Sequence, residues 1–472
     1  MRNRDSPLTN SFMTSLLIDT HAHLDSGQFK NDLDAVLQRA ADQGVGTILT
    51  VGCDLESSRT SVDLALRYPH VYASVGVHPH DASQVDRPAL EELARMVEAV
   101  DKVVAIGEIG LDFYRDRSPR EVQRQAFRQQ VRLARELGKP LIIHDRDAHD
   151  EVLAILAEEK AYEVGGVLHC FSGDLAIARR CIEMGFLISF AGPLTYPKND
   201  GLRSIAAALP VDVMLVETDC PYLAPQQQRG KRNEPALVRQ TAERLAEIKG
   251  LSLEDIARIT SRNAWRLFGI GQVDQQARIA YQIRDSLYLN ITNRCTNRCT
   301  FCAKFHDFTV KGHQLCLQHE PTSDEVKQAI GDPGHYREVV FCGYGEPLLR
   351  LDLVKEVSSW LKKKGIVVRI NSDGQANLVH GRNILPELEG LIDAISVSVN
   401  AADARTYQRI CQSQFGEAGY AAVLEFLQLA VKSIPSVTAT AVSLPGIDIE
   451  ACRKVAEQLG VAFRPREYNE VG

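Results

Sequence analysis

The 472-residue sequence contains no apolar run long enough to cross a membrane. Its polar start, Met1 to Asp5, is not followed by the apolar core of a secretory signal peptide. It also contains no low-complexity segment and no short-period repeat, which excludes a solenoid. From these absences we expect a cytoplasmic protein without a membrane partner.

Cysteine and excess positive charge are also scarce. Eleven cysteines are too few for a disulfide scaffold in a chain of this length, and they fit a reducing cytoplasm. The net charge of −7 weighs against broad electrostatic capture of nucleic acid. It does not exclude a nuclease in which bound metals and a few local Arg and Lys residues contact phosphate.

The first half of the chain alternates short apolar runs with helical patterns. Helical periodicity covers residues 31–43 and 121–137, and closing helices are expected within 234–268. Eight such units predict an α/β fold, a complete (β/α)8 TIM barrel. The apolar runs lie near residues 16–20, 46–52, 71–77, 103–109, 140–144, 166–170, 186–190 and 213–218.

A second alternation follows, as expected for a chain longer than a single core usually allows. Its six strand-like runs lie near residues 286–291, 338–342, 366–370, 394–399, 436–442 and 461–465. Six βα units predict a partial (β/α)6 barrel that is open on one side. The predicted domains are a disordered N-terminal extension (1–14), the first barrel (15–270), a linker (271–283) and the second barrel (284–472).

Six metal-capable side chains follow apolar runs of the first half: His21, His23, Glu108, His144, His169 and Asp219. The carboxyl ends of barrel strands meet at one mouth, so we expect these side chains to lie together. Residues two apart on a strand share a face, and His21 and His23 could therefore hold one divalent ion.

A second ion would need a bridging oxygen and further nitrogens, which Glu108, His144 and His169 could supply. Asp219 could ligate the first ion and hydrogen-bond its water. Two divalent ions would stabilise the attacking and leaving oxygens at phosphorus. Mg, Mn, Zn, Fe and Co all fit such ligands.

These residues lie in recognisable strings. They are Ile18-Asp19-Thr20-His21-Ala22-His23-Leu24-Asp25, Gly76-Val77-His78-Pro79-His80, Gly107-Glu108-Ile109-Gly110-Leu111-Asp112, Ile143-His144-Asp145-Arg146, His169-Cys170-Phe171-Ser172-Gly173, Glu217-Thr218-Asp219-Cys220-Pro221 and Arg229-Gly230-Lys231-Arg232-Asn233-Glu234-Pro235. In this order they resemble the TatD family of metal-dependent hydrolases, over roughly residues 15–270. The resemblance implies a TIM barrel with divalent metals and DNase activity, often exonucleolytic.

By position, the resemblance assigns metal-ligand roles to six residues: His21, His23, Glu108, His144, His169 and Asp219. It makes Asp219 the general base, with Glu108 as the second catalytic residue. His78, Arg146 and Arg229 become candidate contacts to phosphate or substrate, although a surface salt bridge or a core hydrogen bond would also explain them. The family also includes other hydrolases, so an amide or ester hydrolase, such as a D-aminoacyl-tRNA deacylase, is the alternative to a nuclease.

Three cysteines, Cys295, Cys299 and Cys302, form a C-x3-C-x2-C cluster after the first strand of the second alternation. Three thiolates on one loop suit three irons of a 4Fe–4S cluster and leave the fourth iron open. Zinc, with help from His306 and Cys316, is a weaker alternative because the spacing of these residues is not matched. A thioredoxin-like redox pair is weaker still.

The cysteine spacing and the aromatic Phe301 resemble the radical SAM superfamily. The resemblance extends to Gly343-Tyr344-Gly345-Glu346-Pro347, Asn371-Ser372-Asp373-Gly374 and Ser396-Val397-Ser398-Val399-Asn400. It implies a bound 4Fe–4S cluster and S-adenosyl-L-methionine (SAM), with Glu346 near the methionine amino group. The implied SAM contacts are Gly343, Gly345, Glu346, Pro347, Asn371, Ser398 and Asn400.

Together the two halves predict a bifunctional enzyme, a divalent-metal hydrolase fused to a radical SAM enzyme of unknown substrate. The expected partners are DNA or a nucleotide and a one-electron reductant such as flavodoxin or ferredoxin. In the alternative, the iron–sulfur domain is a redox sensor that controls the hydrolase.

Overall fold

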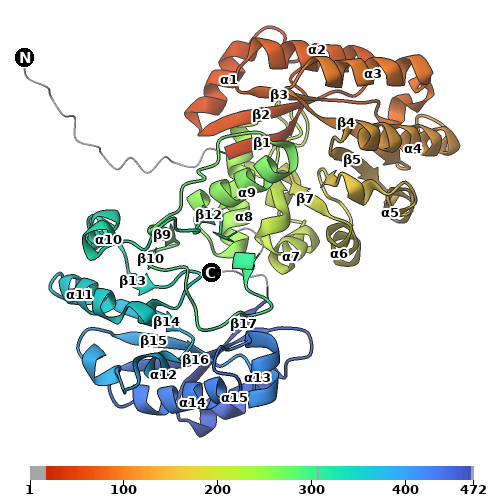
Figure 1. Cartoon of the computed structure of the whole chain (residues 1–472). Helices are drawn as coiled ribbons and strands as arrows, with labels where there is room; N and C mark the ends of the chain where they lie inside the picture. The colour runs from red at the N-terminus through yellow and green to blue at the C-terminus, as the bar shows by residue number, and fades with distance from the viewer. Residues whose placement is uncertain (1–16, 306–307, 469–472) are drawn as a thin grey trace, which may run out of the picture. The chain divides into compact units, whose positions relative to one another are not determined.

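The computed structural model describes residues 17–305 and 308–468, which form two compact units divided between Val273 and Asp274 (Figure 1). The predicted N-terminal extension, residues 1–14, lies outside the described residues. No helix in the described part of the chain is both long enough and apolar enough to span a bilayer.

The described part of the first unit contains eight parallel strands in sequential order. They are β1 (Leu17–Ala22), β2 (Val45–Val51), β3 (Val71–Val75), β4 (Val103–Asp112), β5 (Leu141–Arg146), β6 (Gly166–Leu168), β7 (Phe186–Phe190) and β8 (Met214–Val216). The ring closes where Ala22 bridges Cys220 in parallel fashion and the His23 amide donates to the Cys220 carbonyl at 2.8 Å. All eight predicted strands and the TIM barrel are therefore confirmed.

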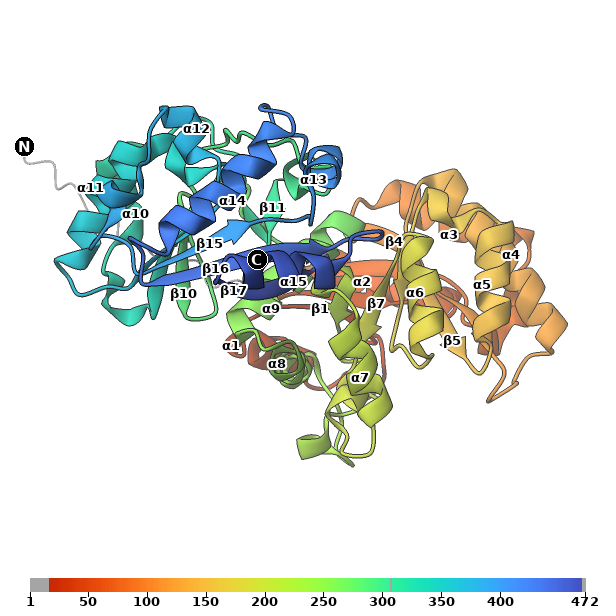
Figure 2. The ribbon, with the colours of Figure 1, turned by 90° about the horizontal axis from the view of Figure 1, so that it is seen from below.

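Helices connect these strands, and neighbouring helices such as α3, α4, α5 and α6 lie side by side outside β4 and β5 (Figure 2). The helices are α1 (Leu33–Asp42), α2 (Leu55–Arg67), α3 (Arg87–Ala99), α4 (Arg120–Leu137), α5 (His149–Glu158), α6 (Leu175–Glu183), α7 (Asp200–Ala208), α8 (Val238–Lys249) and α9 (Leu253–Phe268). The predicted closing helical region is two helices, because Gly250 ends α8 in a left-handed conformation and Ser252 caps α9.

The second unit contains one main sheet in the order β17-β16-β15-β14-β13-β10-β9. Its strands are β9 (Ala280–Ile283), β10 (Ser286–Leu289), β13 (Glu338–Phe341), β14 (Val368–Ser372), β15 (Ala394–Ser398), β16 (Ser436–Ser443) and β17 (Ala462–Glu467), beside a small pair, β11 (Thr309–Val310) and β12 (His313–Gln314). The six predicted strands are confirmed as six parallel strands in order. Curvature into a partial barrel stays a prediction.

Residues 280–283 were predicted to be part of a linker, and this was wrong, because they form β9. This strand pairs antiparallel with β10 through a tight turn and extends the sheet at its edge. The pattern did not reveal it because four residues are too few to show alternation.

The main helices of this unit are α10 (Ser323–Ile330), α11 (Leu351–Lys362), α12 (Ala376–His380), α13 (Ala404–Cys411), α14 (Ala418–Ala430) and α15 (Ile449–Gln458). In Figure 1, α12, α14 and α15 lie along one side of the strands. The apolar face of the sheet packs into a core with these helices, through Leu287, Phe341, Ile370 and Val397. Each unit therefore has a hydrophobic core of its own.

Candidate metal site and cysteine loop

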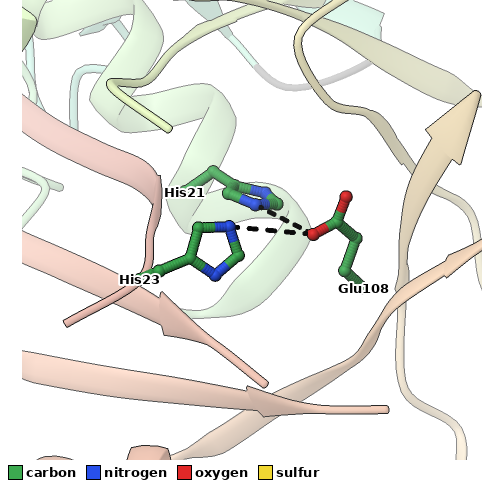
Figure 3. Close-up of side chains that lie close together, drawn as sticks. All are labelled: His21, His23 and Glu108. Atoms are coloured by element: carbon green, nitrogen blue, oxygen red, sulfur yellow. Dashed lines mark ion pairs between the residues drawn. The ribbon is translucent and has the colours of Figure 1, made fainter. Parts of the chain in front are cut away.

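The six predicted metal ligands of the first unit meet at one end of its barrel. His21 lies on β1 and His23 directly after it, and Figure 3 shows both imidazoles turned toward Glu108 of β4. Register shifts interrupt the regular pairing of β1 between Asp19 and Ala22, and that of β4 between Ile106 and Ile109. Such bulges redirect side chains beside active sites, and they occur here at the level of His21 and Glu108.

The Glu108 carboxylate lies at the centre of the cluster. Its Oε1 is 2.7 Å from His144 Nδ1 and 2.8 Å from His169 Nε2. Its Oε2 is 3.5 Å from His21 Nε2 and 3.8 Å from His23 Nε2. Burial alone would raise the pKa of Glu108, but the surrounding imidazoles, His169 first, hold that pKa well below its usual value.

Asp219 completes the other side of the cluster. Its Oδ1 lies 3.2 Å from His23 Nε2 and 3.8 Å from His21 Nε2. Burial opposes ionisation, but the hydrogen bond with His23 and the charge of His21 lower the pKa of Asp219. The His21 ring also stacks on the His169 ring, with their centroids 4.0 Å apart.

Buried nitrogens without partners show that these residues fit a metal. Both ring nitrogens of His21, and Nδ1 of His169, are buried and make no hydrogen bond. A buried polar atom in this state requires an explanation, and a cation supplies one. In the described residues, three sets have ligand atoms within 4.8 Å of one another: His21, His23 and Glu108; His78, Glu108 and His144; and His21, His169 and Glu217. Because Glu108 belongs to two sets, it could bridge two ions.

Two residues of the cluster, His78 and Glu217, were not predicted as metal ligands. His78, expected to contact substrate, is buried with its Nε2 3.6 Å from Glu108 Oε1 and belongs to a potential ligand set. Glu217 was not predicted at all, yet it accepts the Cys170 amide at 2.6 Å and lies 3.4 Å from His169 Nδ1. Glu217 lies two residues before Asp219 in a quoted string, and only this proximity could have suggested it.

Four further residues to which the sequence assigned no role lie around the cluster: Asp112, His80, Cys53 and Asp19. Asp112 Oδ2 is 3.3 Å from His144 Nε2 and 2.9 Å from His80 Nε2. The Cys53 thiol lies 3.6 Å from both His23 Nδ1 and Glu108 Oε2. Asp19 accepts bonds from the Thr218 hydroxyl at 2.6 Å and the Thr218 amide at 2.9 Å, and burial raises its pKa to about 8.

The two predicted arginine contacts stack on tyrosines. The Arg146 guanidinium lies 4.0 Å above the Tyr114 ring, and the Arg229 guanidinium lies 4.8 Å from the centre of the Tyr196 ring. Arg146 ends β5 two residues after His144, which places it beside the cluster. Arg229 is exposed in the loop after β8.

In the second unit, the three predicted cysteines occupy the loop after β10. Two of its amides donate to the end of α13: Arg298 to the Cys411 carbonyl at 2.9 Å and Thr300 to the Ile410 carbonyl at 2.8 Å. Burial raises the pKa of the Cys295 and Cys302 thiols.

The Cys411 side chain raises the pKa of the Cys299 thiol more than burial does. The three thiols are partly buried and form no disulfide, and their donor chemistry fits an iron–sulfur cluster. Two further residues were considered as zinc ligands. His306 lies outside the described residues, and Cys316 is exposed.

A buried polar network anchors the cysteine loop. Asn297 of the loop donates to the Tyr407 hydroxyl at 3.1 Å, and Gln375 donates to both Asn297 Oδ1 at 2.7 Å and Tyr407 at 3.1 Å. Thr296 donates to Asp373. The loop is thus held by side chains that follow β14 and by a side chain of α13.

The two glycines predicted to contact SAM lie so close to neighbouring residues that there is no room for a side chain at either position. A Cβ atom at Gly343 would collide with the Asn290 side chain, and one at Gly345 would collide with the Thr292 carbonyl. Pro347, two residues after Gly345, is buried. The glycine segment is therefore held against the residues that precede the cysteines.

Glu346 is occupied within the protein. Its carboxylate accepts the Asp373 amide at 2.6 Å, the Ser372 hydroxyl at 3.0 Å and the Leu348 amide at 3.0 Å. Burial raises the pKa of Glu346 well above its usual value.

The other predicted SAM contacts are Asn371, Ser398 and Asn400. Asn371 donates to the Cys342 thiol at 3.1 Å, and Ser398 is half-buried at the end of β15. Asn400 is buried; it donates to the Cys411 thiol at 3.6 Å and accepts the Val442 amide at 3.3 Å.

The first unit is thus a TIM barrel whose strand ends hold a histidine–carboxylate cluster, which defines the class of metal-dependent hydrolases. More particularly, the chain belongs to the family of TatD related DNases, which matches residues 18–269. Residues 289–459 match the radical SAM superfamily. The chain is therefore a TatD-type hydrolase domain fused to a radical SAM domain, and both domain types are enzymatic.

Known relatives match the first unit. The metal-dependent hydrolase YabD of Bacillus subtilis is 45% identical over 257 residues, covering 54% of this chain and 100% of the relative. The 3′-5′ ssDNA/RNA exonuclease TatD of Citrobacter rodentium is 38% identical, covering 54% of this chain and 98% of the relative. The crystal structure of YJJV, a TatD homologue from Escherichia coli K12, matches with a TM-score of 0.53 at 34% identity, covering 55% of this chain and 100% of that one.

Proposed function

We propose that the first unit hydrolyses phosphodiester bonds of single-stranded nucleic acid with two divalent ions. The observation that carries this proposal is the Glu108 carboxylate, which two potential ligand sets share. The exonuclease named among the relatives supports a nuclease over the amide or ester hydrolase.

Each proposed role follows from the contacts of a side chain. The ligands are His21, His23, Glu108, His144, His169 and Asp219, with His78 and Glu217 as added candidates. When bound, the ions would polarise phosphate and water. Asp219, kept ionised by His23 and His21, would accept the proton of the attacking water. Arg146 and Arg229 would contact the substrate backbone.

We propose further that Cys295, Cys299 and Cys302 hold a 4Fe–4S cluster and that Gly343, Gly345, Glu346, Pro347, Asn371, Ser398 and Asn400 line a SAM site. Together these groups supply one-electron chemistry, with flavodoxin or ferredoxin as reductant. Since its carboxylate is occupied, Glu346 would act by holding the loop. The proposed domains are residues 15–270 and, with β9 included, residues 280–472, in a cytoplasmic enzyme.

The hydrolase is tested with full chain that has been stripped of metal and reloaded with Mg, Mn, Zn, Fe or Co in turn. Single-stranded DNA, single-stranded RNA, duplex DNA and D-aminoacyl-tRNA are offered in parallel. We expect metal-dependent release of nucleotides from the single strands, lost in His21→Ala and kept in His335→Ala, an exposed histidine of the second unit. Deacylation without nuclease activity would refute the proposal.

The second unit is tested by anaerobic reconstitution with iron and sulfide, followed by reductant and SAM. We expect 5′-deoxyadenosine from the native chain and none from a Cys295→Ala, Cys299→Ala, Cys302→Ala variant. A reducible cluster that never cleaves SAM would favour the redox sensor instead.

A further inference from the structure

The main sheet of the second unit has one apolar face and one polar face. Residues paired between neighbouring strands point to the same face. Tyr281 pairs with Tyr288, Tyr288 with Val340, and Val340 with Arg369. These side chains therefore lie on the face opposite the core, since Leu287, Val339 and Ile370 belong to that core.

The same register carries the polar face across the rest of the sheet. Asn371 pairs with Ser396, Ser398 with Thr440, Thr440 with Arg464, and Val442 with Arg466. The residues on this face are Tyr281, Tyr288, Glu338, Cys342, Arg369, Asn371, Ser396, Ser398, Thr440, Arg464 and Arg466. A sheet face with this many polar groups is unsuited to packing against apolar side chains and suited to a polar ligand.

The three arginines of this face differ in their partners. Arg369 makes a two-pronged ion pair with Glu338, at 2.8 and 3.0 Å, and donates to Asn371 at 2.7 Å. Across the residues that the structure describes, neither Arg464 nor Arg466 has a carboxylate within ion-pair distance. Arg464 is exposed and Arg466 half-buried, so both are open to solvent. Partial burial and the charges of Arg369 and Arg466 lower the pKa of Arg464, while Tyr288 and Glu338 raise it.

We infer that Arg464 and Arg466 bind the phosphate group of a phosphate-monoester substrate on this face. Two cations two residues apart, neither of them in an ion pair with a carboxylate of the described residues, match a group that carries nearly two negative charges. The planar guanidinium also pairs with phosphate through two parallel hydrogen bonds. Asn371 and Ser398, proposed to contact SAM, lie on the same face, so the phosphate would hold the substrate beside the proposed SAM site.

The test measures the reaction of individual arginines with phenylglyoxal in the full chain, by mass spectrometry of peptides. This readout is local, so phosphate bound at the metals of the first unit does not affect it. The probes are inorganic phosphate, deoxyadenosine monophosphate, deoxyadenosine and succinate. Arg405, an exposed arginine of α13, serves as the control within each sample.

We expect both phosphate probes to slow labelling of Arg464 and Arg466 about fivefold at saturation and to leave Arg405 unchanged. Stronger protection by the nucleotide than by inorganic phosphate would identify a nucleotide substrate. Arg464→Gln should abolish protection of Arg466, and Arg466→Gln that of Arg464, whereas Arg405→Gln should change neither. Circular dichroism establishes that each variant is folded.

Equal labelling with and without the phosphate probes would overturn the inference. Protection by deoxyadenosine, or by succinate as strongly as by phosphate, would overturn it as well, because the phosphate would not be what is recognised. Neither result depends on whether the first unit proves to be a nuclease.

Discussion

At the scale of single residues, Glu108 connects most of the candidate metal site. One carboxylate faces imidazoles from β1, from β5 and from the residue after β6, and it is almost completely buried. A buried charge of this kind is stable only because cations or hydrogen-bond donors surround it. The site should therefore depend on this charge more than on any single imidazole.

Glu108→Gln keeps the size of the side chain and removes its charge. We expect the variant to bind less metal and to hydrolyse single-stranded DNA at least about a hundredfold more slowly, because the bridging charge is lost. Metal per chain and initial rates measure this. Glu243→Gln, at a partly exposed carboxylate of α8, should match the native chain. Native metal content in the Glu108 variant would contradict the bridging role.

Tyr420 of α14 provides a test of pH dependence outside the metal cluster, and its ring lies 5.5 Å from that of Tyr407. Burial raises the pKa of its hydroxyl from 10.0 to about 12, and the hydroxyl has no hydrogen-bond partner. The fold favours the neutral form, so this stability is present below pH 10 and is lost as pH rises toward 12. Over that pH range, the free energy of unfolding of Tyr420→Phe should fall by about 2 kcal/mol less than that of the native chain. Denaturant unfolding at pH 9 and 11.5 measures the difference, and equal losses would refute it.

At the scale of elements, both sites depend on irregular segments that regular strands hold in place. The register shifts in β1 and β4 lie at the level of His21 and Glu108, whose side chains face one another. In the second unit, Tyr407 of α13 and Gln375 after β14 hold the cysteine loop through Asn297. In both units the reactive groups lie on loops and strand ends while the sheet supplies rigidity.

Tyr407→Phe removes the hydroxyl that accepts bonds from Asn297 and Gln375. Two buried donors lose a partner, so we expect the second unit to lose about 1–3 kcal/mol of stability. The loop should also hold less iron after reconstitution. Iron content and denaturant unfolding measure the two effects. Tyr420→Phe, which removes a hydroxyl without a partner nearby, is the matched control. Native stability and iron content in Tyr407→Phe would show that the network does not anchor the loop.

At the scale of the whole molecule, the chain joins two units that each bury a separate core. Cores that share no residues should unfold independently. Fusion motivates the hypothesis of a shared pathway, in which one unit alters a nucleotide and the other trims the strand. That hypothesis requires the fused chain to turn over its substrate faster than the separated units do.

Residues 1–273 and 274–472, produced separately, should each fold. We expect calorimetry of the full chain to show two transitions that match those of the parts, because neither core needs the other. A single transition in the full chain would contradict independent folding. Hydrolysis by 1–273 at the rate of the full chain would remove the motive for coupling.

Much of this protein could be predicted from the sequence. The eight and six strands follow from apolar runs, because parallel strands are buried on both faces. The positions of the six candidate metal ligands and the three cysteines follow from their places at strand ends. The register between strands and the contact partners of individual side chains could not be predicted in this way. Glu217 and Cys53 reach the cluster only because the barrel closes, and β9 was too short to recognise.

The sequence by itself determined the order of elements and the kinds of chemistry, since periodicity and residue type are local properties. The tertiary structure alone decided which atoms face one another. It turned Glu346 inward to Ser372 and Asp373, placed His78 in the cluster, and aligned Arg464 and Arg466 on the polar face. The physical reason is that strand register and bulges set side-chain direction, and both depend on hydrogen bonds between segments far apart in the chain.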